Sequence, residues 1–216
     1  MPASQDIKHP VFARLYERLS VKEDKRGGSR YRAELLDGAT GRVIEVGAGN
    51  GLNFAHYPTN VSRVLAVEPE PRLRASAARA AATAPVPIEV VAGVADHLPA
   101  DDGAFDMGVA SLVLCTVPDP DAALAELRRV IRPGGELRFY EHVVSHRRGA
   151  ALLERALDAT LYPPLAGGCH LARDTAAAIE RAGFRIERSR RFSFGPSAIG
   201  PQIAHVVGTA RRPDQP

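Results

Sequence analysis

A short apolar run followed by three glycines at alternate positions constrains this chain more than any other feature. Residues 42–52 read RVIEVGAGNGL, with β-branched side chains at positions 43, 44 and 46 ahead of the glycines. β-branched residues favour a strand, and clustered glycines favour a turn where the backbone takes positive φ or approaches a ligand closely. Residues 52–54 can begin a helix, whose first N–H groups have no partner within the helix. The sequence therefore predicts a strand, a glycine turn and a helix, which together form a cradle for a nucleotide-like ligand.

The spacing of these glycines distinguishes two kinds of nucleotide-binding fold. A dinucleotide-binding loop has the pattern G-x-G-x-x-G, and counting from Gly47 its third glycine would fall at Leu52. An NAD-linked oxidoreductase is therefore disfavoured. The pattern here is an acidic residue followed by G-x-G-x-G, namely Glu45, Gly47, Gly49 and Gly51. It resembles the first motif of class I S-adenosylmethionine (SAM) dependent methyltransferases, and the resemblance implies that SAM is the cofactor.

The resemblance also implies which residues contact the cofactor. In that family the acidic residue lies near the ammonium group of the methionine part, and the glycine backbone passes under the ribose and the amino-acid portion. An N-terminal helix commonly covers the cofactor, so Tyr16 is a candidate for a hydrogen bond to the cofactor carboxylate, with simple packing of the helix as the alternative. The expected cofactor-binding residues are Tyr16, Glu45, Gly47, Ala48, Gly49, Asn53, Glu68, Pro69, Val94, Ala95, Ser111 and Leu112.

A carboxylate follows the second apolar run at the distance that the first motif requires. The run spans residues 61–67 and ends in Glu68-Pro69, so that Glu68 lies 21 positions beyond Gly47. In nucleotide-binding folds a carboxylate about 20 residues beyond the glycine loop binds ribose hydroxyls. Two hydroxyls on neighbouring carbons match the two oxygens of one carboxylate. We therefore expect Glu68 to bind the ribose. A helix-capping glutamate is the alternative, and Pro69 at a helix start is consistent with both.

The third strand, expected over residues 88–91, precedes a motif that departs from the family. Related sequences often carry Gly-Asp-Ala-Glu-x-Leu-Pro, in which the Asp accepts a hydrogen bond from the adenine amino group. Residues 93–99 read GVADHLP, so that Val94 occupies the position of that Asp. Backbone contacts of Val94 and Ala95 with the adenine remain expected, and Asp96 is a candidate substitute for the missing side chain.

The next apolar run, residues 107–114, suits a strand that is buried on both faces. Its last residues, from Ser111 onward, should border the methyl group and the acceptor, because ligands of doubly wound sheets bind at the carboxyl ends of strands. The Asp/Asn-Pro-Pro-aromatic run typical of enzymes that methylate amino groups of DNA and RNA is absent. Cys115 is expected to be a small packing residue rather than a nucleophile.

The predicted fold is a single α/β domain over residues 1–216. We expect a Rossmann-like, doubly wound sheet of seven strands, mostly parallel with an antiparallel C-terminal edge strand, and helices on both faces. Residues 133–135, Pro-Gly-Gly, should end a helix over 122–131 and lead into a strand over 136–143. Residues 1–40 should form a helical cap with a mobile loop between its two helices. The chain, 216 residues and 45% hydrophobic, can bury a full core.

Two residue groups on the acceptor side invite chemical interpretations. Residues 145–173 are rich in leucine and form an insertion that should build an apolar chamber over the acceptor, with core packing of an ordinary amphipathic helix as the alternative explanation of the leucines. His142 and His170 are candidates for groups that favour a thiolate, and Glu141 for an orienting or basic carboxylate, with a structural role as the alternative for each. His142 and the pair Cys169-His170 lack the spacing of a metal site, so no metal is expected.

A narrower resemblance indicates the class of acceptor. Residues 111–117, 141–143, 167–175 and 200–203 resemble the small-molecule thiol methyltransferase branch of the superfamily. Mammalian members of that branch carry a hydrophobic membrane anchor ahead of the domain. No such run occurs here, which predicts a cytoplasmic relative without a membrane span.

The favoured function is methyl transfer to a small, apolar molecule, with a thiol as the first-choice acceptor. Transfer to oxygen, nitrogen or carbon of a quinone or natural product is one alternative, and a non-catalytic SAM-binding module is another. Nucleic acid is not an expected partner, because the net charge of +3 comes from arginines interleaved with acids.

Overall fold

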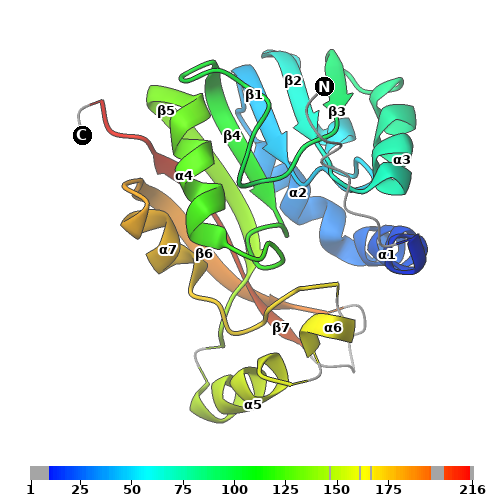
Figure 1. The fold of residues 1–216 in the computed structure, drawn as a ribbon, viewed down its shortest axis with the longest axis vertical. Helices are drawn as coiled ribbons and strands as arrows, with labels where there is room; N and C mark the ends of the chain where they lie inside the picture. The colour runs from blue at the N-terminus through cyan, green and yellow to red at the C-terminus, as the bar shows by residue number, and fades with distance from the viewer. Residues whose placement is uncertain (1–9, 146, 161, 166, 196–201, 215–216) are drawn as a thin grey trace.

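The computed structural model describes residues 10–145, 147–160, 162–165, 167–195 and 202–214, which form one seven-stranded sheet covered by helices (Figure 1). The strands are β1 (Gly41–Val46), β2 (Val61–Val67), β3 (Ile88–Val91), β4 (Phe105–Ser111), β5 (Ile131–His142), β6 (Arg185–Phe194) and β7 (Ile203–Arg211). The helices are α1 (Pro10–Glu23), α2 (Ser29–Leu36), α3 (Pro71–Ala81), α4 (Pro120–Val130), α5 (Arg148–Asp158), α6 (Tyr162–Leu165) and α7 (Thr175–Arg181).

The sheet has the order β3-β2-β1-β4-β5-β7-β6. Strands β1 to β5 pair in parallel, and β7 lies antiparallel between β5 and β6. The chain moves outward from β1 to β3 and then returns to place β4 beside β1, so the order reverses between β1 and β4. The predicted α/β class is confirmed. The expected C-terminal hairpin does form the edge, but β6 is its outermost strand and the antiparallel β7 lies one position inward.

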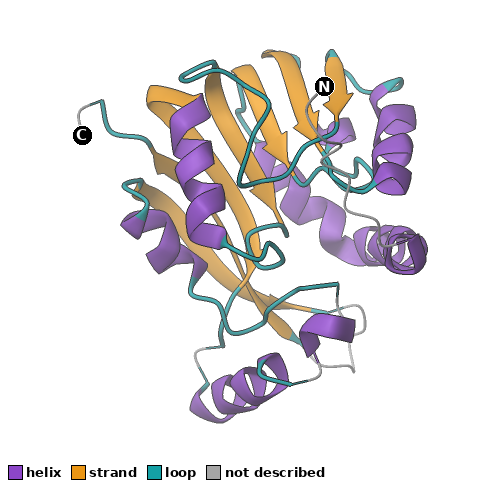
Figure 2. Cartoon of the chain, viewed as in Figure 1, coloured by secondary structure: helices purple, strands orange, loops and turns teal. Residues whose placement is uncertain are grey.

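Apolar side chains cover both faces of the sheet. On one face, Leu124 and Leu127 of α4 pack with Ile179 of α7 against the strands, in the helical spacing that turns one side of α4 inward. Figure 2 shows α4 and α7 on the near side of the sheet. On the other face, Leu35 of α2 and Ala77 of α3 belong to a second buried cluster. Burial on both faces explains why β4 is apolar from Met107 to Ala110.

The N-terminal cap differs from the expectation of a mobile loop. Helix α1 runs into a π-helical turn, Asp24–Gly28, and then into α2 without an intervening loop. Gly27 takes φ +121° inside that turn, a conformation open to glycine, and so allows a kink where the two helices meet. Arg32 of α2 is paired with Asp24 at 3.0 Å, which holds the turn closed.

The helix expected after the glycine loop is reduced to a single 3-10 turn, Phe54–His56. Pro58 accounts for this, because the residue before a proline is disfavoured in the helical region. Tyr57 accordingly takes an extended conformation, with φ −65° and ψ 124°.

Two strand boundaries also differ from the prediction. Strand β4 ends at Ser111 rather than at residue 114, because Leu112 turns the chain with φ +58°. Strand β5 begins at Ile131, directly after α4, so the Pro-Gly-Gly sequence lies within the span of the strand rather than ahead of it.

The insertion after β5 contributes two helices. Helices α5 and α6 lie below the sheet in Figure 1, beyond the ends toward which the parallel strands point. Leu152 and Leu153 of α5 are 66% and 61% exposed. In the described part of the chain, no helix is both long and apolar enough to cross a membrane.

Candidate active site

The glycine loop follows β1 in a conformation that requires glycine. Gly47, Gly49 and Gly51 take φ values of +65°, +58° and +81°. A Cβ on Gly47 would overlap the side chain of Val113, so the loop after β1 and the turn after β4 are in direct contact. A Cβ on Gly49 would lie 3.4 Å from the ring and hydroxyl of Tyr16. The ring of Tyr16 in α1 therefore packs directly over the backbone of Gly49.

Glu45 is held inside the protein by two side chains. It is 2% exposed, and its two carboxylate oxygens accept from Asn53 Nδ2 at 2.8 Å and from the Tyr57 hydroxyl at 2.7 Å. Burial raises the pKa of Glu45 to about 7, although both hydrogen bonds act in the opposite direction. Two of the expected cofactor-binding residues, Glu45 and Asn53, are thus bonded directly to each other.

Arg32 connects the cap to this group. Its Nη1 donates to Asn53 Oδ1 at 2.9 Å and to Ser111 Oγ at 3.3 Å, while its Nε donates to Asp24 at 3.0 Å. One buried guanidinium thus joins the cap, the glycine loop and the end of β4. Neither Arg32 nor Tyr57 was expected from the sequence, because each belongs to no motif and reaches the site only through the fold.

Glu68 lies at the carboxyl end of β2, beside the glycine loop. One of its oxygens accepts from Gly49 N at 2.7 Å and the other from Glu70 N at 2.9 Å. Burial raises the pKa of Glu68. The capping role that competed with ribose binding belongs to Glu70, whose side chain accepts from Leu73 N at the start of α3. Glu68 is therefore not needed to cap α3, and Pro69 only carries the chain between the two carboxylates.

The remaining expected cofactor residues lie along the same edge of the sheet. Val94 and Ala95 are half-buried in the loop after β3, where Val94 forms an isolated bridge with His97. Ser111 is buried at the end of β4, and Leu112 N donates to the Tyr140 carbonyl at 2.6 Å. Because β1, β2, β3 and β4 are parallel, their carboxyl ends bring these residues and the glycine loop to one edge.

Two sulfurs and an imidazole meet on the acceptor side. His142 Nδ1, at the end of β5, lies 3.0 Å from Cys169 Sγ and 3.6 Å from Cys115 Sγ, and the two sulfurs lie 3.7 Å apart. Both cysteines are buried and His142 is half-buried. Hydrogen bonds from Cys115 and His142 lower the pKa of the Cys169 thiol, whereas the pKa of Cys115 is raised by that same bond and by burial. We call these three residues the Cys-His cluster. Cys115 joins it because the chain turns directly after β4.

Glu141 holds the loop that carries Cys115. It is fully buried, and its carboxylate accepts from the backbone N–H groups of Val113, Leu114 and Cys115 at 3.0 to 3.1 Å. These contacts give Glu141 an orienting role. His170 contributes through its backbone N, which donates to the Cys115 carbonyl at 2.8 Å, while its ring is partly exposed 3.5 Å from Asp158.

A second histidine lies against His142. His205 of β7 pairs with His142 across the sheet, and the two rings are 4.6 Å apart. His205 Nδ1 donates to the Ile203 carbonyl, so Nε2 carries the lone pair. That buried Nε2 has no hydrogen-bond partner among the described residues.

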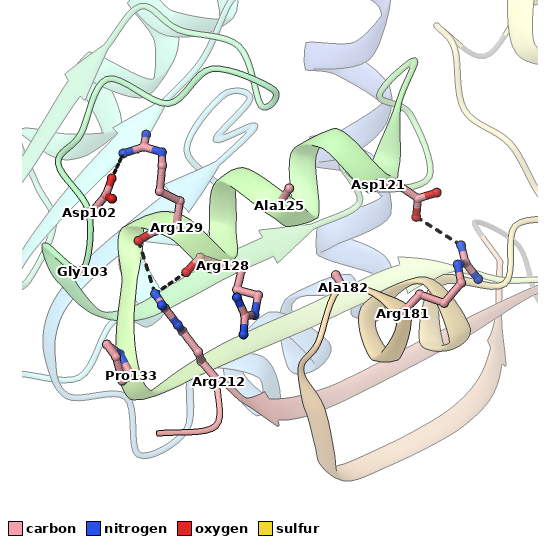
Figure 3. A pocket seen from close by; sticks show the side chains of 10 residues that line it. All are labelled: Asp102, Gly103, Asp121, Ala125, Arg128, Arg129, Pro133, Arg181, Ala182 and Arg212. Atoms are coloured by element: carbon pink, nitrogen blue, oxygen red, sulfur yellow. Dashed lines mark hydrogen bonds and ion pairs between the residues drawn. The ribbon is translucent and has the colours of Figure 1, made fainter. Parts of the chain in front are cut away.

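A separate hollow lies away from these groups. It encloses about 850 Å³ between α4, α7 and the chain after β7 (Figure 3). Its arginines are mostly engaged: Arg129 pairs with Asp102 at 2.8 Å and Arg181 with Asp121 at 3.1 Å. No residue of the glycine loop or of the Cys-His cluster lines it, so it is not the site described above.

Comparisons with known proteins agree with this geometry. Residues 44–139 match the family model described as a methyltransferase domain. The chain is 36% identical to the human thiol S-methyltransferase TMT1B, over 95% of this chain and 88% of that protein. A SAM-dependent methyltransferase of Thermotoga maritima has the same fold, with a TM-score of 0.67, 21% identity and coverage of 94% and 98% of the two chains. Geranyl diphosphate methyltransferase in complex with SAM gives a TM-score of 0.67 and 12% identity, covering 86% and 84%.

The residues at the glycine loop fit SAM as the cofactor. A Cβ on Gly49 would press against the ring of Tyr16, and Glu68 offers two oxygens that each keep a second lone pair for a ribose hydroxyl. Burial raises the pKa of Tyr16 to about 12, which keeps its hydroxyl protonated at neutral pH. The chain belongs to the class I SAM-dependent methyltransferases, and within them it resembles the small-molecule thiol S-methyltransferases.

Proposed function

We propose that this methyltransferase transfers the methyl group to the sulfur of a small, apolar thiol. The observation that carries the proposal is the 36% identity to a thiol S-methyltransferase over 95% of this chain, which extends well beyond the matched cofactor domain at 44–139. The exposed leucines of α5, Leu152 and Leu153, supply apolar surface on the acceptor side and support an apolar acceptor.

The cofactor half is assigned as follows. Glu45 faces the ammonium of the methionine part. The hydrogen bonds from Asn53 and Tyr57 hold its carboxylate in that position. Glu68 takes the ribose hydroxyls, and the backbone of Val94 and Ala95 borders the adenine. Tyr16 closes the site from α1. SAM, when bound, supplies a methyl group on a sulfonium, and displacement by a thiolate needs the acceptor in line with that methyl group.

On the acceptor side, the chain's contribution is positioning. Ser111, the last residue of β4, and Leu112, directly after it, lie at the edge where the acceptor approaches. Glu141 fixes the backbone of residues 113–115, and His142 presents its ring beside that loop. The backbone N–H of His170 donates to the Cys115 carbonyl and so holds the same loop. These residues align an acceptor rather than carry a covalent intermediate, and alignment alone can account for a large part of the acceleration of a displacement.

The test is a panel of acceptors offered to the purified protein with SAM. We expect turnover with apolar thiols at least about tenfold faster than with phenols or amines of the same shape, measured as release of S-adenosylhomocysteine and confirmed by the mass of the product. Transfer confined to phenols or amines would contradict the thiol assignment. Binding of S-adenosylhomocysteine without transfer to any member of the panel would favour a non-catalytic SAM-binding module.

A further inference from the structure

The Cys-His cluster has a composition and a shape that methyl transfer from SAM does not require. We propose that Cys115, His142 and Cys169 form a binding site for a thiophilic divalent cation, for which zinc is the best match. Two thiolates and one imidazole are ligands that zinc prefers, and three protein ligands with one open position are typical of zinc sites that bind a further molecule.

The distances within the cluster agree with one tetrahedral ion. Zn–S bonds of about 2.3 Å and Zn–N bonds of about 2.1 Å place two sulfurs about 3.8 Å apart and a sulfur about 3.6 Å from a nitrogen. The observed separations are 3.7 Å between the sulfurs and 3.6 Å between Cys115 Sγ and His142 Nδ1. The third, from His142 Nδ1 to Cys169 Sγ, is 3.0 Å. It would open by about half an ångström once the ion replaces the shared proton.

The three ligands are held in place before any ion binds. Cys115 N donates to Glu141 and its carbonyl accepts from His170 N. Arg173 adds two hydrogen bonds from Nη1 to carbonyls of the same turn. Gly168, with φ +90°, lets the loop before Cys169 approach that turn, since a Cβ there would lie 3.1 Å from a carbonyl oxygen. Supporting hydrogen bonds of this kind orient the ligands of metal sites.

A disulfide is the rival explanation for two buried cysteines. The 3.7 Å between the sulfurs is well beyond a disulfide bond of about 2.04 Å, and both cysteines are free. The imidazole of His142 lies within contact distance of both sulfurs, an arrangement that a disulfide does not need. Within the described part of the chain, no second set of three such ligands lies as close together.

The open fourth position would accept an exogenous thiolate. This step rests on the proposed function. The cluster lies at the carboxyl ends of β4 and β5, the edge at which an acceptor meets the cofactor. Binding of the ion releases the proton of Cys115 and the proton that Cys169 and His142 share, and an acceptor thiol that joins the ion releases a third. The metal-bound acceptor would then be a thiolate at neutral pH without a dedicated base.

The first experiment measures metal binding alone. The reduced full chain is titrated with Zn²⁺ against a chromophoric chelator, and with Co²⁺ by absorption spectroscopy. We expect one ion per chain, a spectrum of tetrahedral cobalt with thiolate ligands, and affinity at least about a hundredfold weaker in Cys169→Ser and His142→Asn. His97→Asn, which removes an exposed histidine outside the cluster, should bind as the wild type does. Circular dichroism checks the fold of each variant.

Wild-type protein that binds Zn²⁺ no better than His142→Asn would overturn the site. So would a cobalt spectrum without thiolate absorption, which does not depend on how any variant folds. Formation of a Cys115–Cys169 disulfide when the reduced protein is exposed to oxygen, at the same rate with and without excess Zn²⁺, would also overturn it.

The second experiment tests the open position without SAM. Phenylmethanethiol is added to the Co²⁺ protein, and the sulfur-to-cobalt absorption should rise by about half as a third sulfur joins two. An unchanged spectrum at saturating thiol would overturn the open position. The outcome is separate from the proposed function, because metal and thiol binding with no methyl transfer would refute the transfer alone. Methyl transfer to thiols that survives complete chelation would refute the role of the ion alone.

Discussion

The cofactor side, around residues 45–53, and the acceptor side, around residues 142–173, differ in how their polar groups are held. On the cofactor side Glu45, Asn53, Tyr57 and Arg32 form one buried chain of charged and neutral hydrogen bonds. On the acceptor side two sulfurs and an imidazole meet, Glu141 and Arg173 bond to backbone groups of the adjoining turn, and α5 leaves Leu152 and Leu153 exposed.

The difference teaches what each side has to recognise. The cofactor is one molecule of fixed shape and charge, and a rigid, fully bonded set of groups suits it. An acceptor varies between related enzymes, and apolar surface with few directional bonds can accommodate that variation. Substitutions should therefore have large, general effects on the cofactor side and small, substrate-dependent effects on the acceptor side.

The largest effect is expected from Gly49→Arg. The backbone at Gly49 has φ +58°, so an arginine there would be strained. Its Cβ would lie 3.4 Å from Tyr16, and the rest of the side chain would fill the space that we assign to the cofactor. We expect affinity for S-adenosylhomocysteine to fall at least about a thousandfold, measured by isothermal titration, with the fold retained by circular dichroism.

Gly38→Arg is the matched control for that substitution. Gly38 has a similar φ of +70°, but nothing lies within 4 Å of a Cβ there. It should cost stability of about 1 kcal/mol and leave cofactor affinity unchanged. Equal loss of affinity in both variants would show that strain, and not the space under Tyr16, explains the effect.

The second prediction concerns pH. The pKa of Glu45 is raised from its ordinary value of 4.5 to about 7, chiefly by burial, so the folded protein keeps a proton that the unfolded chain has lost. Stability from this group is fully present below pH 4.5 and is lost as pH rises through 7, by up to about 3 kcal/mol. Urea unfolding of wild type and Glu45→Gln should show a steeper fall with pH in the wild type. Parallel curves would contradict the assignment to Glu45.

The smallest effect is expected on the acceptor side. Leu152→Glu and Leu153→Glu change side chains that are 66% and 61% exposed, so stability should move by no more than about 0.5 kcal/mol. Cofactor affinity should be unchanged, while KM for apolar thiols rises a few-fold. Leu15→Glu, at a 51% exposed leucine of α1, is the control and should leave that KM unaltered. A loss of cofactor affinity in the Leu152 or Leu153 variant would contradict the prediction that the two sides respond separately to substitution.

Much of the cofactor side could be predicted from the sequence, because its residues are local in the chain. Gly47, Gly49 and Glu68 follow strands β1 and β2, and parallel strands bring their carboxyl ends together without further information. The strand, turn and carboxylate are each a short pattern with a physical cause. Their common edge follows from the α/β class alone.

The rest could not be predicted, because it depends on contacts between distant segments. Arg32 reaches Ser111 across 79 positions, and Cys115 reaches Cys169 across 54, with no spacing rule that links either pair. The loop expected in the cap is closed by the pair of Arg32 with Asp24, a contact that becomes recognisable only once α2 is placed. Glu141 could be named from the sequence as an orienting carboxylate, but its three partners in the turn after β4 could not, because they are backbone N–H groups that any residue supplies.

The position of β7 in the sheet affects the order in which the strands can pair while the chain is being synthesised. Strands β5 and β6 do not pair with each other, and β7 pairs with both, by register from Glu136 to His142 on one side and from Arg185 to Phe194 on the other. A chain that emerges from the ribosome in sequence order therefore has an unpaired edge at β5 until β7 has been made. His205 arrives beside His142 in that final step. Strands β1 to β4 can pair before β7 is made, whereas β5 gains its second neighbour only with β7.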